Sequence, residues 1–200
     1  MYITPEYPDS KRRLVVELTK FFMTHSNPSI VCVGNSKILG DCFAPLVGQL
    51  LINHYHLPIH IYGNKDHNIL SHNLPAYKHL TETYHNGTLV LDSAMTSHPY
   101  HNTLTFHQSA CIVDHFNTKT RLGNAHILAN INLYPLSNLS SLQKVKKENV
   151  SYLVHQTAHA IFLAYKCAQV CKQPNYDSSR SKIQPTKCIG FLQNKKGVSL

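Results

Sequence analysis

The sequence predicts a single three-layer α/β domain, with a mostly parallel sheet and helices on both faces. Short apolar runs, of the length of buried strands, alternate along the chain with longer segments whose apolar residues recur at helical spacing. With 200 residues, 42% of them hydrophobic, the chain is long enough to bury one substantial core. Alternating strands and helices imply parallel strands joined by right-handed crossovers, which bring helices onto the sheet.

The first helix is predicted at residues 11–24, after an extended lead-in at residues 1–9. Its apolar residues share one face, at positions 14, 15, 18, 21 and 22. Asp9 or Ser10 is expected to cap its start, and Asn27-Pro28 ends it.

Strands and helices then alternate, separated by residues typical of turns, such as Gly34-Asn35, Gly63 and Asn86-Gly87. Pro45 fits the first turn of a helix, where its missing N–H would be unpaired anyway. The expected elements are strands at 30–33, 57–62 and 88–91 and helices at 43–55 and 76–85.

The second half of the domain is expected to add further strands and a closing helix. The expected segments are a loop at 93–102, edge strands or a hairpin at 103–106 and 110–113, a strand at 127–131, a loop at 135–141 and an amphipathic helix at 150–170. The domain is predicted to cover residues 1–171. Residues 172–200, rich in Pro, Ser, Asn and Lys, are predicted to be a flexible basic tail.

Charge and composition limit the expected partners and location. Of the formal charge of +9, residues 172–200 carry +5, so the predicted domain is only mildly basic and nucleic acid is not an expected partner. No run reaches the roughly 18–20 apolar residues of a membrane span, and a membrane partner is not expected. No apolar signal segment precedes the domain, so the six cysteines are expected to be reduced thiols in the cytoplasm.

Two aspartates follow predicted parallel strands and are the main functional candidates. Asp41 lies in the loop after the first strand, and Asp92 comes directly after the third. Since aligned parallel strands end at one edge of a sheet, both side chains can approach one crevice. Paired carboxylates can share a proton, hold a metal, or divide acid and base roles. Alternatively, each aspartate caps the helix that follows it.

Other polar residues give weaker signals. His126, at the start of the fifth predicted strand, is a candidate metal ligand or proton carrier, or one of fifteen histidines in an ordinary hydrogen bond. His155 and His159 share a helix face, but the zinc-protease motif requires Glu where Gln156 stands, so solvent-facing side chains are expected.

Cys42 follows Asp41 near a helix N-terminus, where a thiol pKa can be lowered. No local signature supplies the base that a cysteine nucleophile needs. The loop from Gly34 to Gly40 has neither the GxGxxG nor the GKS/GKT pattern, so a nucleotide site is not expected.

The same segments resemble a known family. Gly34-Asn35, Gly40-Asp41 and Pro45–Gly48 resemble the opening loop of the YyaC-type sporulation proteins, which are relatives of the spore germination protease. The resemblance covers residues 28–170 and continues at these segments: His60–Gly63, Asn73-Leu74, the strand ending at Asp92, Gly123–His126, Ile131-Asn132 and the closing helix. It implies the phosphorylase/hydrolase-like α/β fold shared with the hydrogenase-maturation proteases.

The resemblance also implies roles for individual residues. Asp41 and Asp92 correspond to the catalytic pair, and Asn35, Gly40 and His126 are expected to support it or bind substrate. No cofactor is required, although a divalent metal held by the two aspartates and His126 is an alternative suggested by the maturation proteases. The implied protein is an aspartate-dependent, peptidase-like hydrolase acting on a protein or peptide, such as a spore protein, in the cytoplasm of the sporulating cell or inside the spore.

A non-catalytic protein is the alternative implied function. The family usually has Gly where this chain has Ala44, Ser where it has Cys42, and Asp where it has Asn124. These differences agree with a sporulation protein that acts by binding other proteins and keeps a vestigial cleft.

Overall fold

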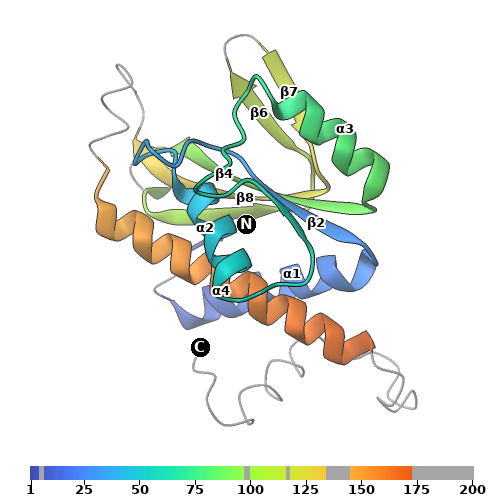
Figure 1. Ribbon diagram of the computed structural model, residues 1–200. Helices are drawn as coiled ribbons and strands as arrows, with labels where there is room; N and C mark the ends of the chain where they lie inside the picture. Colours follow the sequence, from blue (N-terminus) through green and yellow to red (C-terminus); the bar gives the residue numbers. More distant parts are fainter. Residues whose placement is uncertain (5–6, 97–99, 116–117, 134–144, 173–200) are drawn as a thin grey trace.

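The computed structural model describes residues 1–200 except 5–6, 97–99, 116–117, 134–144 and 173–200 (Figure 1). A six-stranded sheet has the strand order β1-β5-β8-β4-β2-β3, and β6 and β7 pair separately. The strands are β1 (Tyr2–Ile3), β2 (Pro28–Cys32), β3 (His60–Tyr62), β4 (Gly87–Thr96), β5 (Thr103–His107), β6 (Cys111–His115), β7 (Thr118–Leu122) and β8 (Ala125–Leu133). The helices are α1 (Pro8–Thr24), α2 (Phe43–Asn53), α3 (Leu74–Tyr84) and α4 (Lys147–Lys172).

The middle of the large sheet is parallel, as the sequence predicts. β2 runs parallel to both β3 and β4, and β4 runs parallel to β8. At one edge of the sheet, β5 runs antiparallel to β8, and β1 runs antiparallel to β5. The carboxyl ends of β2, β4 and β8 therefore lie at the same edge of the sheet, where sites form in open α/β folds.

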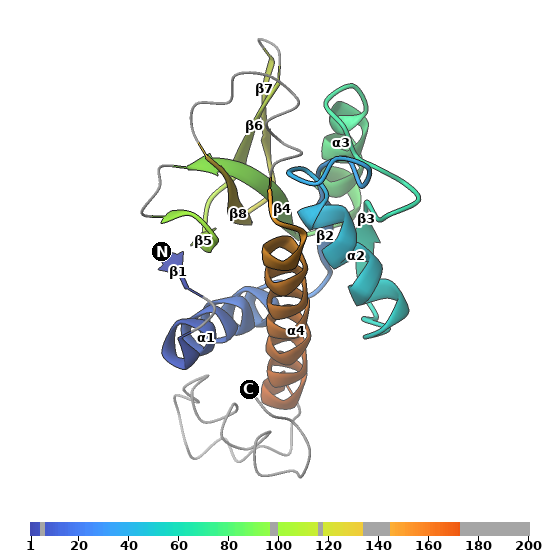
Figure 2. The same cartoon turned by 90° about the vertical axis from the view of Figure 1, so that its left-hand side faces the viewer.

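Both faces of the sheet are covered, which confirms the three-layer architecture. α1, α2 and α4 lie on one face, while α3 and the β6–β7 hairpin lie on the other (Figures 1 and 2). In β2, Ile30 and Cys32 face the large core under the helices, and Val31 faces the smaller core under the hairpin. Strands buried on both faces read as continuous apolar runs rather than alternating ones, and this is why the sequence reveals them.

The four predicted helices are present, but the chain around α1 differs from the prediction. α1 begins at Pro8 with Tyr7 at the N-cap and no side-chain cap hydrogen bond, so neither Asp9 nor Ser10 caps it. Proline is favoured in the first helical turn because its missing N–H leaves no bond unmade. The lead-in is also not simply extended chain, since Tyr2 and Ile3 form an edge strand with β5.

One prediction about the strands is wrong, and of another only one alternative is wrong. The predicted loop at 93–102 is strand up to Thr96, because β4 continues along β8 past a register shift between Ala94 and Met95. The segments at 103–106 and 110–113 are strands, as predicted, but they do not form a hairpin with each other, since β5 pairs with β8 and β6 pairs with β7. The predicted loop at 135–141 and the tail from 173 lie outside the described residues.

Within the described ranges, none of the helices has the length and apolar character needed to span a bilayer.

Candidate active site

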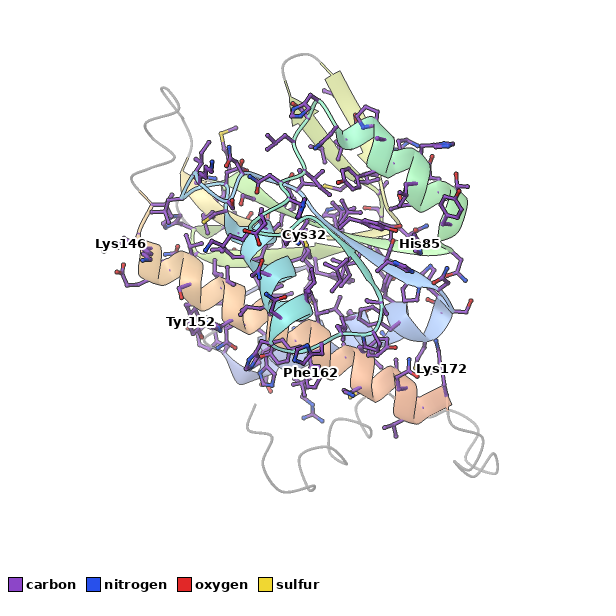
Figure 3. The ribbon with its side chains drawn as sticks, viewed as in Figure 1. Cys32, His85, Lys146, Tyr152, Phe162 and Lys172 are labelled. Atoms are coloured by element: carbon purple, nitrogen blue, oxygen red, sulfur yellow. The ribbon has the colours of Figure 1, made fainter. Side chains whose placement is uncertain are left out.

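Asp41 lies at the end of the loop that joins β2 to α2, two residues before α2 begins. Figure 3 marks Cys32, where that strand ends. The chain then turns through Gly34, whose φ of +136° is accessible almost only to glycine. A Cβ atom at Gly34 would lie 2.2 Å from the backbone oxygen of Asp41. The Asn35 backbone N–H donates a 2.8 Å hydrogen bond to Asp41 Oδ2, which stabilises the ionised carboxylate.

The rest of this loop is anchored from other elements. Ser36 donates its N–H to Asn68 Oδ1 at 3.1 Å and its hydroxyl to the Lys65 carbonyl at 2.8 Å. From β8, Asn132 Nδ2 donates to the Gly40 carbonyl at 2.8 Å. The predicted site residues Asn35 and Gly40 therefore serve to position Asp41.

Asp92 lies inside β4 and not just past its end, which corrects the sequence prediction. The pairing of β4 with β2 ends at Leu91, opposite Cys32, while β4 still pairs with β8 at Asp92. Asp92 is therefore the first residue of β4 beyond the carboxyl end of β2. It is partly buried there, at the edge of the sheet that also carries the Asp41 loop.

The two carboxyl groups interact electrostatically. Burial, and to a smaller extent the negative charge of Asp41, raise the pKa of Asp92 to about 8. The Ser93 backbone N–H, 2.7 Å from Asp92 Oδ1, opposes these effects. At neutral pH this shift keeps Asp92 mostly protonated. The structure thus brings the two predicted site residues close enough for the charge of Asp41 to act on Asp92.

Neither aspartate is used as a helix cap. Cys42, not Asp41, occupies the N-cap of α2, and the Cys42 side chain makes no capping hydrogen bond. Asp92 is a strand residue followed by more strand. The alternative interpretation of both residues as helix caps therefore does not describe this structure.

Two cysteines lie close to the aspartates. Burial raises the pKa of Cys42, and the Asp41 charge adds to this effect, while Cys42 Sγ donates to the Leu39 carbonyl at 3.2 Å. Burial raises the pKa of Cys111 to about 12, with the Asp92 charge contributing. Both residues are at most 4% exposed and keep neutral thiols. Neither has the character of an activated nucleophile.

His126 is built into the sheet rather than presented as a metal ligand. It pairs with Val90, two positions before Asp92 along β4, and is 8% exposed. Its Nδ1 lies 2.9 Å from the Ser109 carbonyl oxygen, and its ring packs against that of His107. Across the described part of the chain, no group of three or more His, Cys, Asp or Glu side chains could hold a metal ion. The residues do not fit the metal centre suggested by the resemblance.

The two α4 histidines have separate environments. His155 is exposed, as the sequence predicts. His159 is half-buried, with Nδ1 3.4 Å from Lys11 Nζ and its ring stacked on Tyr55. Burial lowers the pKa of His159, and the Lys11 charge lowers it further.

Asn132 is a site residue to which sequence reasoning assigned no role. It is 4% exposed, and its Oδ1, like the Ser93 hydroxyl, is buried without a hydrogen-bond partner among the described residues. Buried polar atoms are normally satisfied, so orphaned ones next to a carboxyl pair indicate a place for water or a ligand. The available signal is the pair of asparagines, Asn130 and Asn132, near the end of the last predicted strand.

The match to known proteins covers this whole site. Residues 6–162 match the model of a family described as "Protein of unknown function (DUF1256)". The chain belongs to this family. The matched region runs from the start of α1 into α4, so the family domain contains Asp41, Asp92 and Asn132. No curated protein gives a significant match to the chain.

Replacing Asn132 by Ala is expected to destabilise the family domain by about 1–3 kcal/mol, because the buried Gly40 carbonyl loses its donor. Urea denaturation of the variant and the wild type measures this difference. Asn132→Asp is the matched control, since it keeps the size and one oxygen but removes the amide donor. It should destabilise the protein at least as much as Ala, and wild-type stability in Asn132→Asp would contradict the assigned role.

Proposed function

We propose that this protein is a peptidase-like hydrolase in which Asp41 and Asp92 act as a base and an acid. The observation that carries the proposal is the placement of Asp41 and Asp92 at one edge of the sheet, where burial and the Asp41 charge raise the pKa of Asp92 to about 8. Two carboxyl groups whose environments separate their protonation states can divide acid and base roles at neutral pH. No comparable activation is present at Cys42 or Cys111, whose thiol pKa values are raised by burial.

The proposed reaction begins with a water molecule held between the two carboxyl groups. The Asp41 carboxylate accepts a proton from this water while its oxygen bonds to the scissile carbonyl carbon. Asp92 donates its proton to the carbonyl oxygen, forming a tetrahedral diol. The C–N bond then breaks as the leaving nitrogen takes the proton from Asp41. One diol hydroxyl returns its proton to Asp92, which restores the starting state.

The resemblance to sporulation proteins supports the proposed setting. It suggests a protein or peptide of the spore as the substrate, and the cytoplasm of the sporulating cell or the spore interior as the place of action. The second candidate is a non-catalytic sporulation protein. It is favoured by Ala44 and Cys42, which replace the small residues usual in the family and are at most 4% exposed behind the Asp41 loop.

Peptide hydrolysis by Asp41→Asn and Asp92→Asn proteins tests the proposal. The substrate is a peptide library prepared by digesting a proteome, with new termini identified by mass spectrometry. Each substitution is expected to lower the cleavage rate by about 1000-fold or more while leaving the circular dichroism spectrum unchanged, because each removes one partner of the acid–base pair. Asp66→Asn, at an exposed residue, is the control and should retain full activity.

The pH dependence gives a second test. Activity should fall as pH rises past about 8, since Asp92 then loses the proton that it donates. Full activity in either aspartate variant, or cleavage that persists unchanged at pH 10, would refute the acid–base pair. An inactive wild-type protein that still binds spore proteins would favour the non-catalytic candidate.

A further inference from the structure

A groove borders the loop that carries Asp41. It has a volume of about 390 Å³ and is formed by this loop, α2 and the first turns of α4. Figure 3 labels Lys146, just before α4 begins, and Tyr152, within its first turns. The apolar side chains that line it include Leu39, Leu46, Leu50, Val150 and Val154. The groove is large enough to hold one or two bulky side chains of a ligand.

The groove reaches the residue next to Asp41 in the loop of the proposed site. Cys42 lines it and follows Asp41 directly in the chain, and its Sγ donates to the carbonyl of Leu39, another lining residue. A peptide with its scissile bond at Asp41 could therefore place a neighbouring side chain in the groove without leaving the protein surface.

The charged side chains that line the groove are positive. Lys37 and Lys147 line it and are exposed, and none of the described residues that line it is Asp or Glu. The ion pairs found among the described residues involve neither lysine. Gln49 also lines the groove, and its Oε1 is buried without a partner in the described part of the chain. A ligand with carboxylates at its ends and a backbone N–H donor between them would complement these groups.

The charge of the lining disfavours the chain's own C-terminal residues as the occupant. Residues 172–200 carry six Lys or Arg and one Asp, so they have the same sign as the two groove lysines. An acidic ligand is favoured instead.

We propose that this groove selects the substrate, by binding an acidic peptide segment that carries a bulky aliphatic side chain close to the scissile bond. The inference rests on the proposed peptidase function. The aliphatic side chain occupies the space between α2 and α4, acidic flanking residues pair with Lys37 and Lys147, and a peptide N–H reaches Gln49.

Binding of labelled peptides, measured without turnover, tests this proposal. The protein is the full chain carrying both Asp41→Asn and Asp92→Asn, and the readout is fluorescence polarisation. Three fluorescein-labelled probes share one frame, with Leu-Leu flanked by Glu, Ala-Ala flanked by Glu, and Leu-Leu flanked by Lys. The Glu-flanked Leu-Leu probe is expected to bind at least tenfold more tightly than the other two, and less tightly as salt is added.

Substitutions of groove residues test whether the acidic peptide binds in the groove. Lys37→Glu combined with Lys147→Glu should weaken binding of the acidic Leu-Leu probe at least tenfold, and both residues are exposed, so the fold should tolerate them. Arg13→Glu combined with Lys166→Glu makes the same charge change at exposed basic residues outside the groove and should leave the affinity within twofold. Leu46→Ser tests the apolar contact separately.

The outcomes separate this inference from the proposed function. Tight, groove-dependent binding with no cleavage by the wild type would support the groove and refute the peptidase. Cleavage at the same rate in the groove variants and for all probe sequences would support the peptidase and refute the role of the groove. Equal affinity for the three probes would overturn the inference. So would a change of oligomeric state in Leu46→Ser with no effect on peptide binding, which would assign the groove to a second copy of the chain.

Discussion

Replacing Asp92 by Asn is expected to make the protein more stable at alkaline pH while removing its activity. In the folded protein the Asp92 pKa is raised from 3.8 to about 8, so the folded state holds this proton more tightly than the unfolded chain does. Between about pH 4 and pH 8 the unfolded chain has lost a proton that the folded state keeps. This group therefore lowers the free energy of unfolding by up to about 1.4 kcal/mol for each pH unit in that window.

The free energy of unfolding of Asp92→Asn does not decrease in this way with pH, because the amide does not ionise. Its Oδ1 can still accept the hydrogen bond that the Ser93 N–H donates to Asp92 in the wild type. We expect the variant to exceed the wild type by about 2 kcal/mol or more at pH 9 and to match it near pH 4. Urea denaturation at pH 4, 6 and 9 measures the difference, with Asp66→Asn as the control for losing an exposed carboxylate. Parallel pH profiles for the wild type and Asp92→Asn would show that Asp92 titrates normally.

The cost of burying Asp92 is itself an argument about function. A carboxyl group placed against Cys111 and beside Asp41 destabilises the folded state as pH rises. An apolar residue at position 92 would contribute more to stability. The neighbouring strand residue Leu91, which faces the core under the helices, is apolar and fully buried. Strained or electrostatically unfavourable arrangements of this kind concentrate at functional sites.

The fold was largely predictable because its central strands are buried on both faces. The apolar runs around Ile30 and Leu89 identify β2 and β4 without any tertiary information. The end of β4 was not predictable, because Asp92 and Ser93 have low strand propensity and are kept in the strand by pairing with β8. The partner of β6 was likewise set by long-range packing, so the local sequence did not identify it.

Some features of the site were likewise predictable from the sequence, whereas others depend on long-range contacts. Asp41 and Asp92 could be found because parallel strands bring their carboxyl ends to one edge of the sheet. The Asn132 hydrogen bond joins residues 92 positions apart, and no local pattern reports it. His126 was misleading for a related reason, since its bond to Ser109 depends on the path of the chain between β5 and β6.

Replacing Gly34 by Ala is expected to destabilise the protein by about 3 kcal/mol or more and to disable the site. The φ of +136° is strained for any residue with a side chain, and the new Cβ would lie 2.2 Å from the Asp41 backbone oxygen. The loop must move to relieve this contact, which displaces Asp41 from the Asn35 N–H and from Asp92. Thr83→Ala, at an exposed position of α3, is the control and should change stability by less than about 0.5 kcal/mol.

The Gly34 variant also tests whether the two aspartates are coupled. Once Asp41 moves away, its charge no longer adds to the burial that raises the Asp92 pKa. The alkaline fall in any residual activity, and the pH-dependent part of the unfolding free energy, should therefore move to lower pH than in the wild type. Measuring both quantities in one variant distinguishes coupling from general damage, because a merely less stable protein would keep the wild-type midpoint. An unchanged midpoint in a clearly destabilised Gly34→Ala protein would mean that Asp41 does not influence Asp92.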